Sequence, residues 1–136
     1  MLNPTHYFRN PAAEISYVPA GYLRTDWRSM QAEPVALRAI YEHVLRAMLH
    51  YDVDRVLFVH AQPEPIPELI QSWLVADWIP RAIIEAGYRR CAILELAETG
   101  ARPAARAIGE QVDDVLTYAF FQELEPAEAW LLAESN

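Results

Sequence analysis

Polar side chains that could bind or react with a ligand follow three short apolar runs. Asp26 and Trp27 end the first run, His60 and Gln62 follow the second, and Glu95 lies in the third. If these runs are neighbouring parallel strands, their carboxyl ends meet at one edge of a sheet, where α/β proteins form their sites. Imidazole and carboxylate groups can carry protons or bind a divalent ion near neutral pH. The pattern therefore predicts a ligand site built from these five residues.

Motifs for specific chemistries are missing from the chain. There is no GxSxG, no glycine-rich phosphate loop and no CxxC, and the histidine spacings match no local metal motif. All 11 basic residues are arginine, which excludes a lysine nucleophile or Schiff base. The paired acids, Asp113 with Asp114 and Glu123 with Glu125, fall at predicted turns. His60 can equally be a hydrogen-bonded strand-end histidine, so the sequence favours a non-catalytic protein without metal or cofactor over an enzyme.

Length and composition set broader limits. A chain of 136 residues with 53% apolar residues is one domain with enough material for a core. A net charge of −8 argues against nucleic-acid binding, which needs a basic face. No apolar run is long enough for a signal peptide or a membrane span, so we expect a cytoplasmic, bacterial-type protein. The single cysteine, Cys91, lies in an apolar run and is expected to be a buried hydrophobic residue.

The elements that must position the polar residues follow from periodicity. Two short alternating runs around a Pro–Ala–Gly turn predict a β-hairpin. Three later apolar runs are typical of strands that are buried on both faces. Together the expected strands are Glu14–Val18, Tyr22–Trp27, Arg55–His60, Arg90–Leu96 and Val115–Phe121.

Helices are predicted between the later strands, and each begins at a proline. The four starts are Pro34, Pro67, Pro103 and Pro126. Pro80 lies inside the second helix and predicts a kink or break there. The order β-β-α-β-α-β-α-β-α indicates an α/β fold: a mixed sheet of about five strands, with an N-terminal hairpin, parallel crossovers and four helices. We expect one domain over residues 14–134, after a flexible leader over residues 1–13.

Three stretches carry a resemblance to a known family. They are Tyr17–Leu23 (YVPAGYL), Trp73–Pro80 (WLVADWIP) and Phe120–Leu131 (FFQELEPAEAWL). Over roughly residues 14–133 the chain resembles the STAS domain, the SpoIIAA-like fold of sulfate-transporter tails and anti-sigma factor antagonists, and stand-alone STAS-like proteins in particular.

The resemblance implies a regulatory or protein-binding module, with one departure. Anti-sigma factor antagonists carry a phosphorylatable serine or threonine between the third strand and the second helix. Here that turn, Ala61–Ile66, contains no hydroxyl, and Ser72 falls inside the predicted helix. Glu64 could stand in for a phosphate as a fixed negative charge, although the helix dipole alone favours an acid in a first turn. The expected function is thus non-catalytic binding without the usual phosphoacceptor.

The second helix is the expected partner surface. Trp73 should face the core, and Trp78 is rotated away from it by well over 100° on an ideal helix. Unless a kink at Pro80 brings it back, Trp78 is exposed and forms a partner surface with Glu64, Trp73 and Asp77. The partner would be a second copy or another protein. The alternative function is a small-molecule protein for a nucleotide or lipid, or a weak enzyme, using the strand-end cluster around His60.

Overall fold

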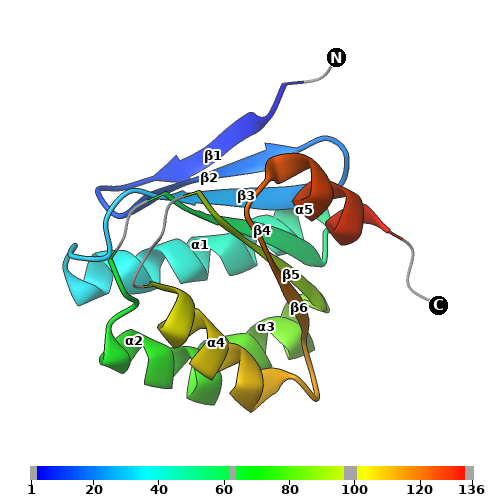
Figure 1. Ribbon diagram of the computed structural model, residues 1–136. Coiled ribbons are helices and arrows are strands. Elements are labelled where there is room, and N and C mark those ends of the chain that lie inside the picture. The colour runs from blue at the N-terminus through cyan, green and yellow to red at the C-terminus, as the bar shows by residue number, and fades with distance from the viewer. Residues whose placement is uncertain (1–2, 62–63, 97–100, 134–136) are drawn as a thin grey trace.

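The computed structural model describes residues 3–61, 64–96 and 101–133, without the side chains of residues 101–105. Its centre is one mixed sheet in the spatial order β1-β2-β3-β4-β5-β6 (Figure 1). The first three strands pair antiparallel, and β3 to β6 pair parallel. The strands are β1 (Thr5–Arg9), β2 (Ala13–Val18), β3 (Tyr22–Trp27), β4 (Arg55–His60), β5 (Arg90–Glu95) and β6 (Thr117–Phe121).

Helices cover the two faces of the sheet unequally. The three crossovers between parallel strands lie on one face, as consecutive right-handed crossovers require, and the last helix lies on the other (Figure 1). The helical elements are α1 (Pro34–Tyr51), α2 (Glu68–Trp73), η1 (Leu74–Trp78), α3 (Ile79–Ala86), α4 (Ala101–Val112) and α5 (Leu124–Leu132). The predicted α/β mixed sheet is confirmed, with α2, η1 and α3 forming the second of the four predicted helical segments.

The sheet has a sixth strand where the sequence predicted a flexible leader. Thr5–Arg9 pairs with β2, but its register shifts between His6 and Phe8. This bulge interrupts the period-two alternation by which a strand is recognised, and therefore hid β1 in the sequence. Aromatic contacts hold the strand on α1: Phe8 stacks on His43 at a ring-centroid distance of 3.7 Å.

The second helix contains a π-helical turn instead of a break at Pro80. The backbone N–H of Ile79 donates to the carbonyl of Leu74, five residues earlier, which is the π-helical pattern. Proline has no N–H to donate, and the wider turn lets the chain continue into α3 with Pro80 in its first turn. A wider turn also rotates each residue less, so Trp73 and Trp78 end on the same side of the helix. Both rings contact Tyr41.

Two buried clusters, one on each face of the sheet, form the core. The larger lies between the sheet and the crossover helices, and the smaller lies under α5. Arg55 and Arg90 donate to the carbonyls at the end of α5, where the helix dipole favours cations. Among the described residues, no helix has both the length and the apolar character needed to span a bilayer.

Candidate functional site

The carboxyl ends of β3, β4 and β5 form one row across the sheet. In the strand register, Trp27 lies beside His60, and His60 lies beside Glu95. All three are buried. Because side chains alternate between faces, Asp26 lies on the opposite face, where its carboxylate pairs with Arg24 at 3.1 Å. The structure therefore brings together three of the five predicted ligand residues; Asp26 is separated from them, and Gln62 lies outside the described residues.

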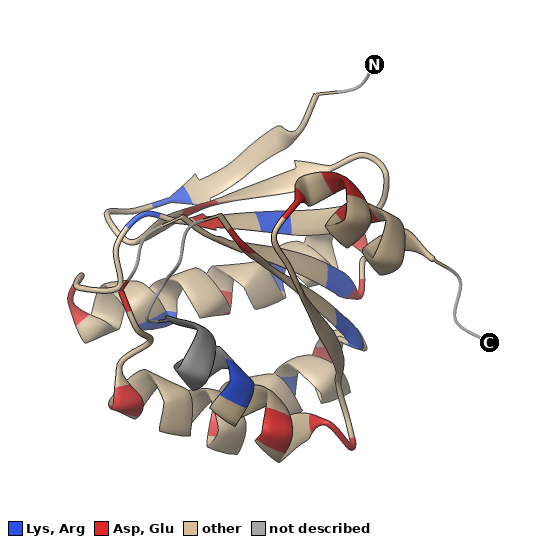
Figure 2. Ribbon diagram, viewed as in Figure 1, with Lys and Arg blue, Asp and Glu red and all other residues tan. Residues whose placement is uncertain are grey.

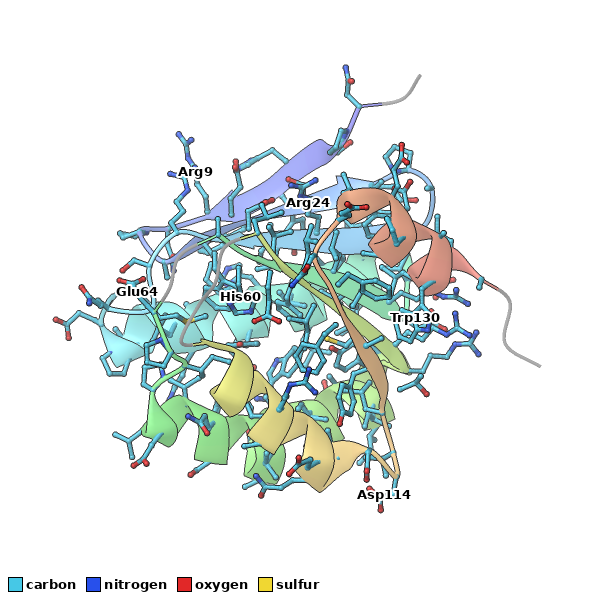
Figure 3. The ribbon with its side chains drawn as sticks, in the orientation of Figure 1. Arg9, Arg24, His60, Glu64, Asp114 and Trp130 are labelled. Atoms are coloured by element: carbon cyan, nitrogen blue, oxygen red, sulfur yellow. The ribbon has the colours of Figure 1, made fainter. Side chains whose placement is uncertain are left out.

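His60 is buried without a hydrogen bond from its imidazole to any residue that the structure describes. Its side chain lies inside the fold (Figure 3), 5% of it is exposed, and its ring centroid is 6.3 Å from that of Trp27. Burial lowers the pKa of His60 from 6.5 to about 4, so the imidazole is neutral at neutral pH. The Nε1–H of Trp27 is likewise buried with no partner in the described part of the chain. Two polar groups in this row are thus available for a ligand.

An apolar cavity of about 60 Å³ lies next to this row. Its wall is formed by β4–β6, α1, the second helical segment and α4, and it includes Tyr41, His60, Trp78, Ile93, Ile108 and Tyr118. Pockets for drug-sized ligands measure several hundred Å³, so this cavity does not admit a nucleotide. The sequence did not predict Tyr41 and Tyr118 as cavity residues, because each lies in an apolar stretch whose pattern indicates only a core position.

The cavity wall contains the single cysteine of the chain. Burial raises the pKa of the Cys91 thiol to about 12, which keeps it protonated and unreactive. The prediction that Cys91 is a buried hydrophobic residue is confirmed. Within the described ranges, no three histidine, cysteine or acidic side chains converge to hold a metal ion.

All four predicted partner residues make contacts within the chain. The Glu64 carboxylate accepts a hydrogen bond of 2.8 Å from the backbone N–H of Met30 and so fixes the loop before α1. Trp73 is half-buried against Tyr41. Asp77 is exposed, and its carboxylate lies 2.8 Å from the guanidinium of Arg81.

Of the two orientations that the sequence left open for Trp78, the structure shows the buried one. Only 1% of its surface is accessible, and its indole Nε1–H donates a 2.8 Å hydrogen bond to the carbonyl of Tyr41. The ideal-helix rotation fails because the π-helical turn η1 separates Trp73 from Trp78. Trp78 is a core residue, and the partner surface centred on it does not exist.

A different surface is open, at the edge of β6. This strand ends the sheet and runs between α4 and α5 (Figure 1). The N–H of Thr117 donates to Arg89, toward β5. Backbone groups alternate in direction along a strand, so those of Tyr118 and Phe120 point to the open edge. The strand contains no charged residue (Figure 2) and no proline, the devices that usually blunt an edge.

Comparison with family models, curated proteins and solved structures gives no match to this chain. The resemblance to the STAS domain therefore stays a prediction. Two features of the described residues could bind a partner or ligand: the open edge of β6 and the cavity beside His60.

Proposed function

We propose that this protein is a non-catalytic, STAS-like protein-binding module, and that its binding surface is the open edge of β6. The observation that carries the proposal is the outward-pointing backbone of Tyr118 and Phe120 in an uncharged, aromatic edge strand. A strand from a partner would pair with these groups and extend the sheet, a recurrent way in which domains recognise extended segments. The proposal places the module in the cytoplasm.

The surroundings of the edge support binding. An open groove at the carboxyl end of β6 is lined by Arg106, Phe120, Phe121, Gln122, Glu123 and Pro126. The guanidinium of Arg106 lies 4.6 Å from the ring centroid of Phe120, which leaves a flat, half-exposed surface of cation and aromatic ring. Aromatic and arginine side chains of this kind are enriched at protein interfaces.

The proposal predicts that blocking the edge backbone removes binding. In Phe120→Pro the outward N–H is lost, while the ladder to β5 is kept because that N–H does not point to β5. Phe120→Leu is the matched control, since it removes the ring and keeps the N–H. Tagged versions of both are used to capture partners from cells that express the protein, with circular dichroism to confirm folding. We expect a protein, which can be the chain itself, that is retained by Phe120→Leu and lost with Phe120→Pro.

Equal capture by the two variants, or no partner with the folded Phe120→Leu bait, would overturn the assignment of β6 as the binding surface. Tyr118→Pro also removes an outward N–H and serves as a second edge-blocking variant if Phe120→Pro fails to fold.

The cavity beside His60 supports a second candidate function, binding of a small neutral molecule. A 150 Å³ apolar cavity holds benzene, so about 60 Å³ has room for about three heavy atoms. The wall is apolar, and His60 adds one neutral hydrogen-bonding group. A short-chain alcohol combines the matching size and polarity.

Ethanol, a short-chain alcohol with three heavy atoms, is the probe for this second function. In an NMR titration we expect saturable shifts of the signals of His60 and of the Ile93 methyl groups, which both belong to the cavity wall. Ile93→Phe fills the cavity and should abolish the shift of His60, whereas the same change at Ile84, 83% exposed on α3, should not. Shifts that persist in Ile93→Phe would contradict binding in the cavity.

A further inference from the structure

We infer that the partner at the β6 edge is a second copy of this chain, paired antiparallel about a two-fold axis that passes by Ala119. The inference rests on the proposed function, because it needs β6 to accept a strand, and it adds the identity and register of the partner. Cyclic dimers of this kind bring the same surface of both subunits together, so the edge must be complementary to itself.

The backbone of β6 has this self-complementarity. In an antiparallel pair, hydrogen-bonded positions are those at which both residues direct N–H and C=O toward each other. Tyr118 and Phe120 direct theirs to the open edge. An axis at Ala119 sets Tyr118 opposite Phe120 of the second copy and sets Phe120 opposite its Tyr118. All the outward backbone groups of the two residues are then paired, and the two sheets become one.

The side chains fit the same register. Tyr118 and Phe120 lie on the α4 face of the strand and touch in a T-shaped contact, with their ring centroids 5.9 Å apart. The two-fold axis adds a cross-strand aromatic pair on each side, an arrangement that stabilises antiparallel strands. On the axis itself, the two Ala119 side chains meet, and a methyl group is small enough to let the strands approach.

Charges on α4 match across the axis. The guanidinium of Arg106 lies over Phe120, and Gly109 lies against Tyr118, so closely that a Cβ atom there would be 2.4 Å from the ring. The helix therefore runs antiparallel to β6. Reversal by the two-fold axis brings Arg106 of one copy toward Glu110, the exposed neighbour of Gly109, on the other. The two-fold axis makes this contact occur twice. Within the described part of one chain, Arg106 and Glu110 form no ion pair with each other that would compete with it.

The other end of the sheet lacks these features. β1 contains a bulge and the charged or titratable side chains of His6 and Arg9, and both bulges and charges protect an edge from pairing. With a net charge of −8 on each chain, association needs local opposite charges, and the facing α4 helices supply them.

A charge-swap experiment tests the inference with the full-length purified protein. Sedimentation velocity over a concentration series should show a dimer for the wild type. Arg106→Glu and Glu110→Arg should each weaken the dimer about tenfold or more, because each sets like charges opposite each other twice. The double variant Arg106→Glu/Glu110→Arg restores opposite charges and should recover the dimer. Arg9→Glu, the same change on the β1 edge, is the matched control and should have no such effect.

The outcomes separate the two proposals. A wild-type protein that stays monomeric at about 100 µM would overturn the second copy as partner, while a different protein captured in an edge-dependent way would keep the proposed function. A dimer that Phe120→Pro does not disturb would overturn the β6 edge as the interface between the copies, and equal capture of partners by Phe120→Pro and Phe120→Leu would overturn the proposed function. A dimer that is lost in Phe120→Pro but not recovered by the charge swap would overturn the antiparallel register at Ala119.

Discussion

Replacing Trp78 by alanine will lower the free energy of unfolding by about 3–5 kcal/mol, the range for removing a large buried aromatic side chain. Trp78 is 1% exposed and packs edge-to-face on both Tyr41 and Tyr88, at ring-centroid distances of 5.2 and 5.6 Å. The change also leaves the carbonyl of Tyr41 without the indole N–H that it accepts. Urea denaturation followed by circular dichroism measures the loss.

Two further variants separate packing from hydrogen bonding. Trp78→Phe keeps most of the ring and removes the N–H donor. The decrease in its free energy of unfolding should therefore be well below that of Trp78→Ala. Trp73→Ala removes the half-buried tryptophan at the start of the same π-helical turn and should also cost less than Trp78→Ala. A Trp78→Ala protein as stable as the wild type would contradict the placement of this residue in the core.

The different outcomes for Trp73 and Trp78 show what periodicity can and cannot predict. The apolar stripe of the second helix and its proline start are local patterns, and they placed the element correctly. The orientation of Trp78 depends on one extra residue per turn in η1, which an ideal rotation of 100° per residue does not contain. Pro80 marked the right place, but it marked a π-helical turn and not a break.

The remaining predictions depended on how segments that are far apart in the sequence pack against each other. The parallel order of β3, β4 and β5 brought Trp27, His60 and Glu95 into one row, as their positions at strand ends predicted. Side chains alternate between the two faces of the sheet along each strand. This rule, applied to Asp26, would have excluded that residue from the face that carries Trp27. The cavity wall and the open edge of β6 depend on which elements pack side by side, and no local pattern contains this information.

The free energy of unfolding will fall as the pH is lowered through the window from about 6.5 to about 4, and His60 is the cause. Its pKa is about 4 in the folded chain and 6.5 without burial, so between these values the unfolded chain binds one more proton than the folded one. Protonation therefore favours unfolding. The stability is fully present above pH 6.5 and is lost progressively toward pH 4, by about 3 kcal/mol for a shift of this size.

His60→Gln is the variant that isolates this effect, because glutamine keeps a polar side chain at the position and does not titrate. Urea denaturation at several pH values should show a clearly shallower pH dependence for His60→Gln than for the wild type between pH 4 and 6.5. The other three histidines, His6, His43 and His50, are half-buried or exposed and are present in both proteins. Equal pH dependence in the two proteins would mean that the His60 imidazole is not desolvated, and the second candidate function would then lose the neutral hydrogen-bonding group that it requires.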